Sequence, residues 1–299
     1  MHYAYLGTTD LHVSRVGFGG MSLGADAAAD RRLLDAARDG GITLFDTADL
    51  YEHGRNEELL GTTFRHCRTQ VVLATKVGNQ WRPDGQGWDW NPSGTYIRQA
   101  AEASLRRLQT DYLDLYQLHG GTIDDPLDEV VEAFERLQEQ GKIRHYGISS
   151  IRPNVIRRNV PATGLSSVML QLSLLDQRPL EAVLPLLAAH GVGVLARGAL
   201  AQGLLAGKPA REYLGQPTET VQAAAAAVAS VAKRLQRLPA EVAGRFVLDT
   251  PGVTAAVLGI RTAAQLAEVL QLARSAPLPP DARQELLQAA PANLYQEHR

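Results

Sequence analysis

Cysteine, lysine and long apolar runs are scarce in this chain of 299 residues. The single cysteine, Cys67, excludes an internal disulfide and a cysteine-based zinc site, and its polar flanks predict a surface turn. No stretch approaches the roughly 20 uninterrupted apolar residues of a membrane-spanning helix. The net charge is −2 and no basic block is present, which argues against nucleic acid or anionic lipid as partners. The first residues lack the order of a secretory signal, so we expect a cytoplasmic protein.

Short aliphatic or β-branched runs alternate with longer amphipathic stretches along the chain. The runs predict strands at residues 16–19, 43–45, 71–75, 113–118, 145–148, 168–172, 192–196 and 255–258. The amphipathic stretches predict helices near residues 30–39, 56–64, 93–108, 127–140, 154–159, 180–190, 218–237 and 263–274. Parallel strands covered on both faces by helices explain this alternation, and eight such units predict a closed (β/α)8 TIM barrel. The last unit departs from the pattern, because two helical stretches lie between the seventh and eighth predicted strands.

The segments outside these units predict a cover at one end and a helix at the other. Residues 3–6 and 11–14 flank the turn Gly7-Thr8-Thr9-Asp10, which indicates an N-terminal β-hairpin that plugs one end of the barrel. A proline-rich break precedes a C-terminal helix near residues 282–289. An open doubly wound sheet is the alternative, but no G-x-G-x-x-G follows a strand. Because no linker or repeat divides the chain, we expect one domain over residues 1–299.

Polar residues end three consecutive predicted strands. Asp46, Lys76 and His119 stand at these ends, and Tyr51 follows Asp46 by five residues. The active site of a (β/α)8 barrel forms where its strands end, so these side chains should meet there. Taken singly, an Asp, Tyr or His at such a place is most often a cap or a packing residue. A buried lysine, by contrast, is costly unless it is paired, and Asp46 would be its partner.

The residue types predict an acid–base role. A tyrosine hydroxyl is a weak acid near neutral pH, and an ammonium a few ångströms away favours its phenolate form. Asp46 would keep Lys76 protonated, while His119 would orient or polarise a substrate oxygen beside Tyr51. Such a site donates a proton to a carbonyl oxygen or removes one from an alcohol. The group contains no nucleophile and no metal cage, so the hydride must come from a cofactor.

Three stretches resemble the aldo-keto reductase superfamily: FDTADLYEHGRNEELLG at residues 45–61, VLATKVG at 72–78 and LDLYQLHG at 113–120. The resemblance covers essentially the whole chain. It implies a (β/α)8 barrel that binds NADP(H) in extended form, and a catalytic tetrad of Asp46, Tyr51, Lys76 and His119 with Tyr51 as general acid. Three further stretches are most similar to the sequences of bacterial monomeric-type reductases of broad carbonyl substrate range: YGISSIRPN, LQLSLLDQRP and VLARGALAQGLL.

The resemblance also implies a set of cofactor-binding residues. Ser149, Ser150 and Gln171 would hold the nicotinamide carboxamide, with Ser150 in place of the family's usual Asn. Arg197 stands where the family often stacks a Tyr or Trp on the nicotinamide, and the segment after it would fold over the pyrophosphate. The complete expected set is Gly20, Met21, Asp46, Ser149, Ser150, Gln171, Arg197, Gly198, Leu200, Gln202, Gly203, Lys208, Gly259, Arg261, Thr262, Gln265 and Glu268.

The adenosine end of that set favours NADPH over NADH. Arg261 and Thr262 stand at the start of a predicted helix, where a guanidinium and a helix N-terminus both favour the dianionic 2′-phosphate. A solvated helix cap is the alternative explanation for Arg261. Val269 replaces the Asn that usually contacts the adenine.

All three tryptophans, Trp81, Trp88 and Trp90, lie in the loop after the third strand. Surface loops rarely contain three tryptophans without a surface to cover, so we expect this loop and His119 to line the substrate pocket and to favour aromatic or apolar aldehydes. Alternatively, each ring simply packs on the rim of the barrel.

The sequence therefore predicts an NADPH-dependent reductase that acts on small-molecule aldehydes and ketones. One alternative is a nicotinamide-binding regulatory or sensor subunit of low turnover, like the potassium-channel β subunits that share this fold, although the intact tetrad argues against it. Another is a Schiff-base lyase that uses Lys76. The natural substrate, the physiological direction and the oligomeric state stay open.

Overall fold

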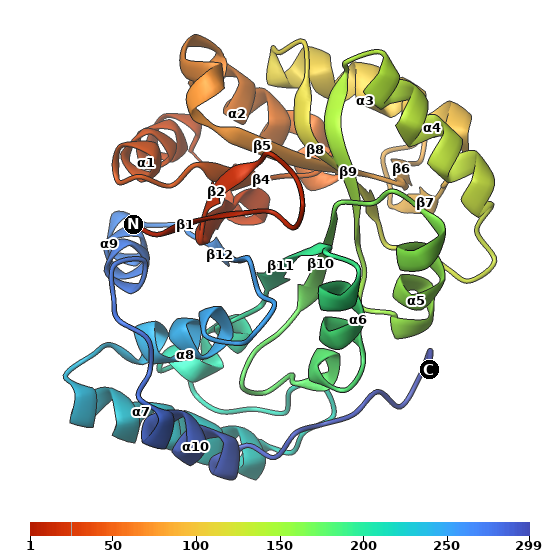
Figure 1. Ribbon diagram of the computed structural model, residues 1–299. Helices are drawn as coiled ribbons and strands as arrows, with labels where there is room; N and C mark the ends of the chain where they lie inside the picture. The colour runs from red at the N-terminus through yellow and green to blue at the C-terminus, as the bar shows by residue number, and fades with distance from the viewer. Residues whose placement is uncertain (25) are drawn as a thin grey trace.

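The computed structural model describes residues 1–24 and 26–299. Within those ranges, eight strands form a closed barrel in the order β10-β11-β12-β3-β4-β5-β8-β9, and all neighbours are parallel (Figure 1). The barrel strands are β3 (Val16–Gly19), β4 (Leu44–Asp46), β5 (Val72–Val77), β8 (Leu113–His119), β9 (Ile143–Ser149), β10 (Ser167–Gln171), β11 (Gly193–Arg197) and β12 (Ala255–Gly259). The predicted (β/α)8 barrel is confirmed, with each predicted strand in place.

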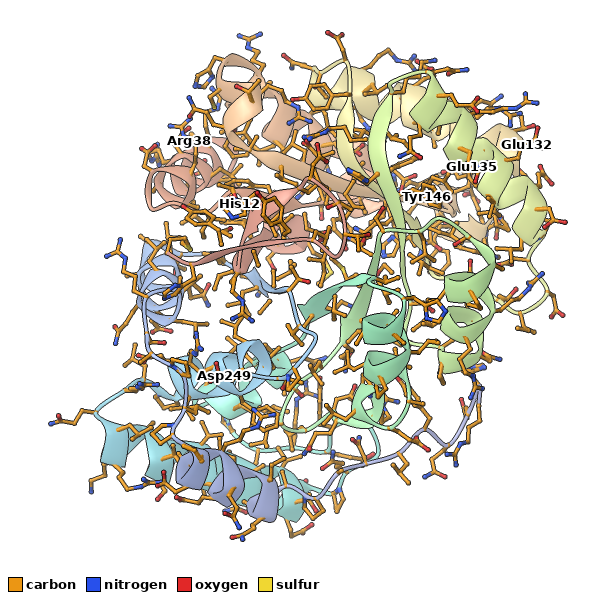
Figure 2. All side chains as sticks on the ribbon, viewed as in Figure 1. His12, Arg38, Glu132, Glu135, Tyr146 and Asp249 are labelled. Atoms are coloured by element: carbon orange, nitrogen blue, oxygen red, sulfur yellow. The ribbon has the colours of Figure 1, made fainter. Side chains whose placement is uncertain are left out.

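Helices surround the barrel (Figure 1). They are α1 (Ala27–Asp39), α2 (Arg55–Phe64), α3 (Gly94–Leu108), α4 (Leu127–Glu139), α5 (Pro153–Ala162), α6 (Val183–Ala189), α7 (Thr218–Leu235), α8 (Pro239–Leu248), α9 (Ala263–Leu272) and α10 (Pro280–Ala289). In α4, Val130, Ala133, Phe134 and Leu137 are buried at helical spacing, whereas Glu132 and Glu135 are exposed (Figure 2). The predicted second helix before the last strand is α8.

The N-terminal hairpin covers the end of the barrel where the strands begin. It consists of β1 (Tyr3–Tyr5) and β2 (His12–Ser14), which are antiparallel. Its apolar side chains join the barrel interior in one cluster: Leu6, Leu11, Val13, Leu44, Ala74, Leu115, Met169, Leu195, Ala255 and Val257. At Gly7 (φ +59°), an added Cβ would lie 2.5 Å from the backbone nitrogen of Gly193, so only glycine permits this approach. The predicted plug is confirmed.

The C-terminal segment crosses the outside of the barrel. Helix α10 packs on α7, where Arg234 forms ion pairs with Asp281 and Glu285. The chain then runs to α5, where the His298 carbonyl accepts a 2.9 Å hydrogen bond from the backbone of Asn154 (Figure 1). The predicted C-terminal helix is confirmed. No helix among the residues described is long and apolar enough to span a membrane.

Two local predictions were wrong in part. The polar segment Arg65–Gln70 is a 3₁₀ turn with exposed residues on both sides of Cys67, but Cys67 itself is buried, and its Sγ accepts a 3.0 Å hydrogen bond from Arg38 Nη1. Helix α6 begins at Val183 rather than near residue 180, because Pro185 is tolerated only in the first turn of a helix.

Candidate active site

The four predicted catalytic side chains meet at the mouth of the barrel. Asp46 ends β4, Lys76 is the fifth residue of β5, and His119 ends β8. Lys76 Nζ donates to Asp46 Oδ2 at 2.7 Å and to the Thr47 carbonyl at 2.8 Å, and it lies 3.4 Å from the Tyr51 hydroxyl. Lys76 and Asp46 are buried, and Tyr51 is half-buried. The tetrad predicted from the ends of separate strands is therefore one hydrogen-bonded group plus a nearby imidazole.

Burial and pairing act against each other on the Asp46–Lys76 pair. Burial raises the pKa of Asp46, and the charges of Lys76 and Arg197 oppose that effect. Burial also disfavours the ammonium of Lys76, but Asp46 and Tyr51 outweigh it and hold the pKa of Lys76 above its ordinary value. Because Lys76 makes two short hydrogen bonds to oxygens, we treat the pair as ionised.

His119 lies beside Tyr51 in an uncharged form. The two rings are edge to face with centroids 6.0 Å apart. Burial, together with the positive charges of Lys76 and Arg197, lowers the pKa of His119 to about 3, so the imidazole is neutral near pH 7. A neutral imidazole can donate a hydrogen bond to a carbonyl oxygen without adding charge. Asn79 Nδ2 fixes the end of β8 by donating to the His119 carbonyl at 3.1 Å.

Apart from Asp46, which ends β4, the predicted cofactor residues follow five consecutive strands in barrel order: β9, β10, β11, β12 and β3. Paired positions link them around the mouth, with Gln171 beside Arg197 and Gly259 beside Gly19. The remaining strands, β4, β5 and β8, carry the catalytic candidates. We call β9, β10, β11, β12 and β3 the cofactor arc, and β4, β5 and β8 the catalytic arc. The two arcs adjoin where His119 pairs with Ser149 and where Gly19 pairs with Asp46.

The nicotinamide candidates form a partly buried polar patch. Ser149 and Ser150 are buried at and after the end of β9. Arg197 Nη1 donates to Gln171 Oε1 at 3.0 Å, and Gln171 Nε2 donates to the Tyr213 hydroxyl at 3.2 Å. Across the mouth, Gly20 is buried after β3 and Met21, the next residue, is exposed.

The phosphate candidates lie farther out on two segments. After β11, the 3₁₀ segment Ala201–Ala206 contains Gln202 and Gly203, and Lys208 Nζ donates to the Gln202 carbonyl at 2.9 Å. After β12, Thr262 caps α9 by accepting from the backbone of Gln265. The other expected members are also on these two segments: Gly198, Leu200, Gly259, Arg261 and Glu268. Arg261 and Glu268 are exposed.

The three tryptophans share one face of a hairpin. Strands β6 (Asn79–Trp81) and β7 (Trp88–Trp90) are antiparallel, with Trp81 opposite Trp88 and Asn79 opposite Trp90. Alternation along each strand places these four side chains on the same face. Trp90 Nε1 donates to Asp125 Oδ1 at 2.8 Å, Trp81 is half-buried, and Trp88 is 47% exposed.

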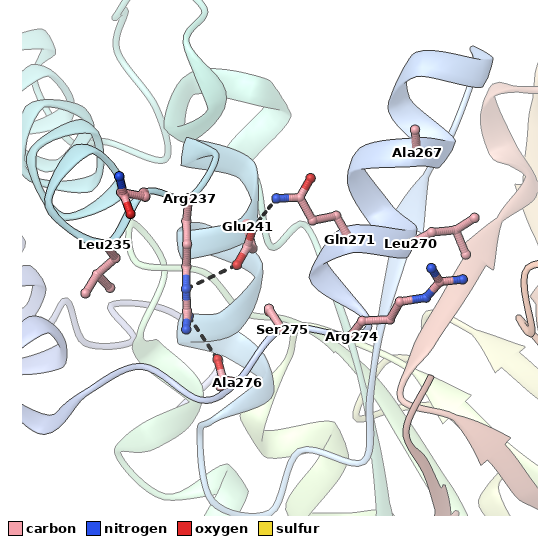
Figure 3. Close-up of a pocket in the computed structure, with 10 residues that line it drawn as sticks. Leu235, Arg237, Glu241, Ala267, Leu270, Gln271, Arg274, Ser275 and Ala276 are labelled. Carbon is pink, nitrogen blue, oxygen red and sulfur yellow. Dashed lines mark hydrogen bonds and ion pairs between the residues drawn. The ribbon is translucent and has the colours of Figure 1, made fainter.

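A separate pocket of about 660 Å³ lies away from this mouth, between α7, α8 and α9 (Figure 3). In this pocket Glu241 accepts a hydrogen bond from Gln271 Nε2 and forms an ion pair with Arg237 (Figure 3). The pocket lies at the opposite end of α9 from Arg261, so it is no part of the candidate active site. The residues described contain no group of three or more His, Cys, Asp or Glu that could hold a metal ion.

A model of the aldo/keto reductase family matches residues 15–290 of this chain. The chain belongs to the aldo/keto reductase family. An uncharacterised oxidoreductase, YqkF of Bacillus subtilis, is 44% identical, and the alignment covers 98% of each chain. The aldo-keto reductase AKR11C1 of Bacillus halodurans in its holo form is 44% identical with a TM-score of 0.95, covering 100% of this chain and 99% of that one. Its apo form aligns over the same shares with 41% identity and a TM-score of 0.84.

The similarity to these relatives supports an oxidoreductase activity on carbonyl compounds. Members of the aldo/keto reductase family bind nicotinamide cofactors. The backbone follows the holo form of the Bacillus halodurans protein more closely than its apo form.

Sequence reasoning missed two buried side chains of this aldo/keto reductase site. Asn56 is buried between both arcs: its Nδ2 donates to the Gly20 carbonyl at 2.7 Å, and its Oδ1 accepts from Thr47 Oγ1 at 2.6 Å. Gln117, which pairs with Lys76 across β5 and β8, is fully buried, and its carboxamide makes no hydrogen bond within the described chain. Both residues lie inside the recognised motifs, so the signal was present without an assigned role.

Proposed function

We propose that this protein is an NADPH-dependent reductase of aldehydes and ketones in which Tyr51 donates the proton. The observation that carries the proposal is the contact of Lys76 with both Asp46 and the Tyr51 hydroxyl in the barrel mouth. A bound reduced nicotinamide would supply the hydride that the carbonyl carbon receives. Tyr51 transfers its hydroxyl proton to the carbonyl oxygen, and the Lys76 ammonium stabilises the phenolate that remains. Neutral His119 donates a hydrogen bond to the same oxygen.

The residues of the cofactor arc fit a nicotinamide dinucleotide. At Gly20, an added Cβ would lie 2.8 Å from Asn56 Oδ1 and 2.9 Å from the Asp46 carbonyl, so the site needs a residue without a side chain. Ser149, Ser150 and Gln171 carry hydroxyl and carboxamide groups, which can donate hydrogen bonds to a carboxamide and accept them from it. Arg197 would lie against the nicotinamide face, where its planar guanidinium can stack. Arg261 and the N-terminus of α9 favour the 2′-phosphate of NADPH.

The hairpin tryptophans are the proposed substrate wall. Trp81, Trp88 and Trp90 face the same way as Asn79, whose side chain contacts the His119 carbonyl. Apolar rings beside an uncharged imidazole suit aromatic or apolar aldehydes. We also propose that residues 1–299 form a single domain.

The deciding experiment follows the oxidation of NADPH, and separately of NADH, with a panel of aromatic and short aliphatic aldehydes and ketones. We expect steady turnover, with NADPH preferred and aromatic aldehydes reduced faster. Absence of turnover across the panel despite NADPH binding would contradict the proposal and favour a sensor role. A covalent adduct on Lys76 after borohydride treatment with substrate would favour a lyase instead.

A further inference from the structure

The turn that carries Tyr51 has an unfavourable backbone conformation. In the 3₁₀ segment Tyr51–Gly54, Glu52 has φ 49° and His53 has φ 55°, values that residues with a side chain rarely adopt. Gly54 follows at φ 85°, where glycine is not penalised. Two successive strained residues persist only where the surrounding structure holds them in place. The turn therefore depends on contacts from outside itself.

Trp81 makes such contacts on both sides of Tyr51. Its Nε1 donates a 3.1 Å hydrogen bond to the carbonyl of Leu50, the residue before Tyr51. Its ring stacks on the imidazole of His53, the second residue after Tyr51, with centroids 3.7 Å apart and planes 21° from parallel. The indole thus bridges the turn from its entry to its strained part.

The segment that carries Trp81 also carries Lys76. Lys76 lies in β5, Trp81 ends β6, and only five positions separate them. Lys76 reaches the Tyr51 hydroxyl at 3.4 Å, while its carbonyl accepts a 3.2 Å hydrogen bond from the backbone of Asp49. Residues 76–81 therefore contact the hydroxyl of Tyr51 and also both ends of the turn that carries it.

We propose that Trp81 is a positioning residue: together with His53 it holds the strained turn so that the Tyr51 hydroxyl stays in contact with Lys76 and in reach of the substrate oxygen. This role rests on the proposed function, because there Tyr51 is the proton donor. For Trp81 this role replaces that of a pocket wall, which Trp88 and Trp90 keep, and the two roles differ in their kinetic consequence. A wall residue changes KM and substrate preference, whereas a residue that positions the donor changes kcat for every carbonyl.

The kinetic test compares two variants of Trp81 with NADPH and with benzaldehyde or propanal. Trp81→Phe keeps a ring for stacking and loses the N–H donor, and Trp81→Leu loses both. We expect kcat to fall by about tenfold in Trp81→Leu and by less in Trp81→Phe, equally for both aldehydes. The solvent deuterium isotope effect on kcat rises, because proton donation becomes slower, and the Kd for NADPH does not change.

The control is Gln80→Ala, which alters the exposed residue next to Trp81 on the opposite face of the hairpin and keeps the wild-type kcat. Trp88→Phe provides the contrast of a wall residue, with a changed KM. A raised KM at unchanged kcat in both Trp81 variants would overturn the positioning role. If Trp81→Leu does not fold, Trp81→Phe and His53→Ala decide, because each removes only one of the two contacts.

A second measurement does not require turnover. The chain has three tryptophans, so its indole N–H signals in an NMR spectrum can be assigned by three Trp→Phe variants. We expect the Trp81 N–H to exchange with solvent more slowly than that of exposed Trp88, and His53→Ala to accelerate it. Exchange as fast as that of Trp88 would overturn the proposal. A wild-type protein with no carbonyl turnover would instead contradict the proposed function and leave this measurement interpretable.

Discussion

The Lys76 ammonium and the Asp46 carboxylate form a 2.7 Å ion pair that is almost completely buried. Removing one member of such a pair leaves an unpaired buried charge, which costs about 3–5 kcal/mol. We therefore expect Lys76→Met to lower the free energy of unfolding by that amount and to abolish carbonyl reduction. Denaturant unfolding and the rate of NADPH oxidation measure the two effects.

The double variant Asp46→Asn/Lys76→Met separates stability from chemistry. It removes both charges, and replacing a buried ion pair by neutral residues is often nearly neutral in stability. We expect it to regain most of the stability that Lys76→Met loses while reduction stays absent. Recovery of turnover along with stability would mean that Lys76 serves only the fold.

Tyr51→Phe removes the proposed proton donor with little else. The Tyr51 hydroxyl makes a long 3.4 Å contact with Lys76, so we expect little change in the melting temperature. Loss of a general acid costs roughly 10² to 10⁴ in rate. The expected result is a kcat reduced to that extent, with NADPH affinity unchanged in a fluorescence titration. Wild-type turnover in this variant would contradict the mechanism.

Arg261→Ala tests the choice of cofactor. A hydrogen bond to a charged group contributes about 1.5–3 kcal/mol, so losing a guanidinium–phosphate contact weakens NADPH binding by about tenfold or more. NADH has no 2′-phosphate, and its Kd should change little. The matched control, Arg274→Ala, removes a guanidinium beyond the other end of α9 and should leave both affinities unchanged. Equal losses for the two cofactors would remove the basis for preferring NADPH.

The raised pKa of the Asp49 carboxyl predicts how the free energy of unfolding depends on pH. Burial, and next the negative charge of Glu57, raise the pKa of Asp49 from 3.8 to about 7. The folded protein therefore holds this proton between about pH 4 and pH 7 while the unfolded chain releases it, so the stabilisation is complete below pH 4 and declines as the pH rises to 7.

Asp49→Asn should remove this part of the decline. We expect the variant to equal the wild type near pH 4 and to exceed it in unfolding free energy above pH 7, with each pKa unit corresponding to about 1.4 kcal/mol. Urea unfolding at several pH values checks this. Asp128→Asn, at an exposed carboxyl on α4, provides the comparison and should keep the wild-type slope. A parallel slope in both variants would show that Asp49 does not titrate in this range.

The barrel could be predicted from the sequence because its strands are covered on both faces and read as apolar runs. The ends of strands were harder to locate where polar side chains find partners. Strand β9 begins at Ile143, two residues before the predicted start, where Ile143 pairs with Leu113 of β8. The polar side chains of Arg144 and His145 at this end both contact Asp10 of the N-terminal hairpin. The sequence near residue 145 contains no sign of that distant partner.

The meeting point of the tetrad candidates could likewise be predicted, since Asp46, Lys76 and His119 stand at or next to the ends of their strands and Tyr51 follows Asp46 by five residues. The contacts that support it could not. The hydrogen bond from Trp81 to the Leu50 carbonyl joins segments 31 residues apart. The left-handed backbone at Glu52 and His53 could not be predicted, because neither position is a glycine or an asparagine, the residues that favour this conformation. The buried position of Cys67 was missed for the same reason, because Arg38, its partner, lies on another helix.

The two arcs of the barrel mouth have a consequence for how this enzyme can change. Apart from Asp46, which belongs to both sets, the residues proposed for the cofactor and those proposed for proton transfer come from separate, uninterrupted sets of strands, which adjoin only at β8–β9 and at β3–β4. Substitutions after β11 or β12 can therefore alter the preferred dinucleotide while the acid–base group is left intact. The loop after β5 does not have this independence, because its Trp81 contacts both sides of the turn that carries Tyr51. Selection, natural or in the laboratory, can therefore change the cofactor without touching proton transfer, whereas a new hairpin after β5 would change the substrate wall and the acid–base group together.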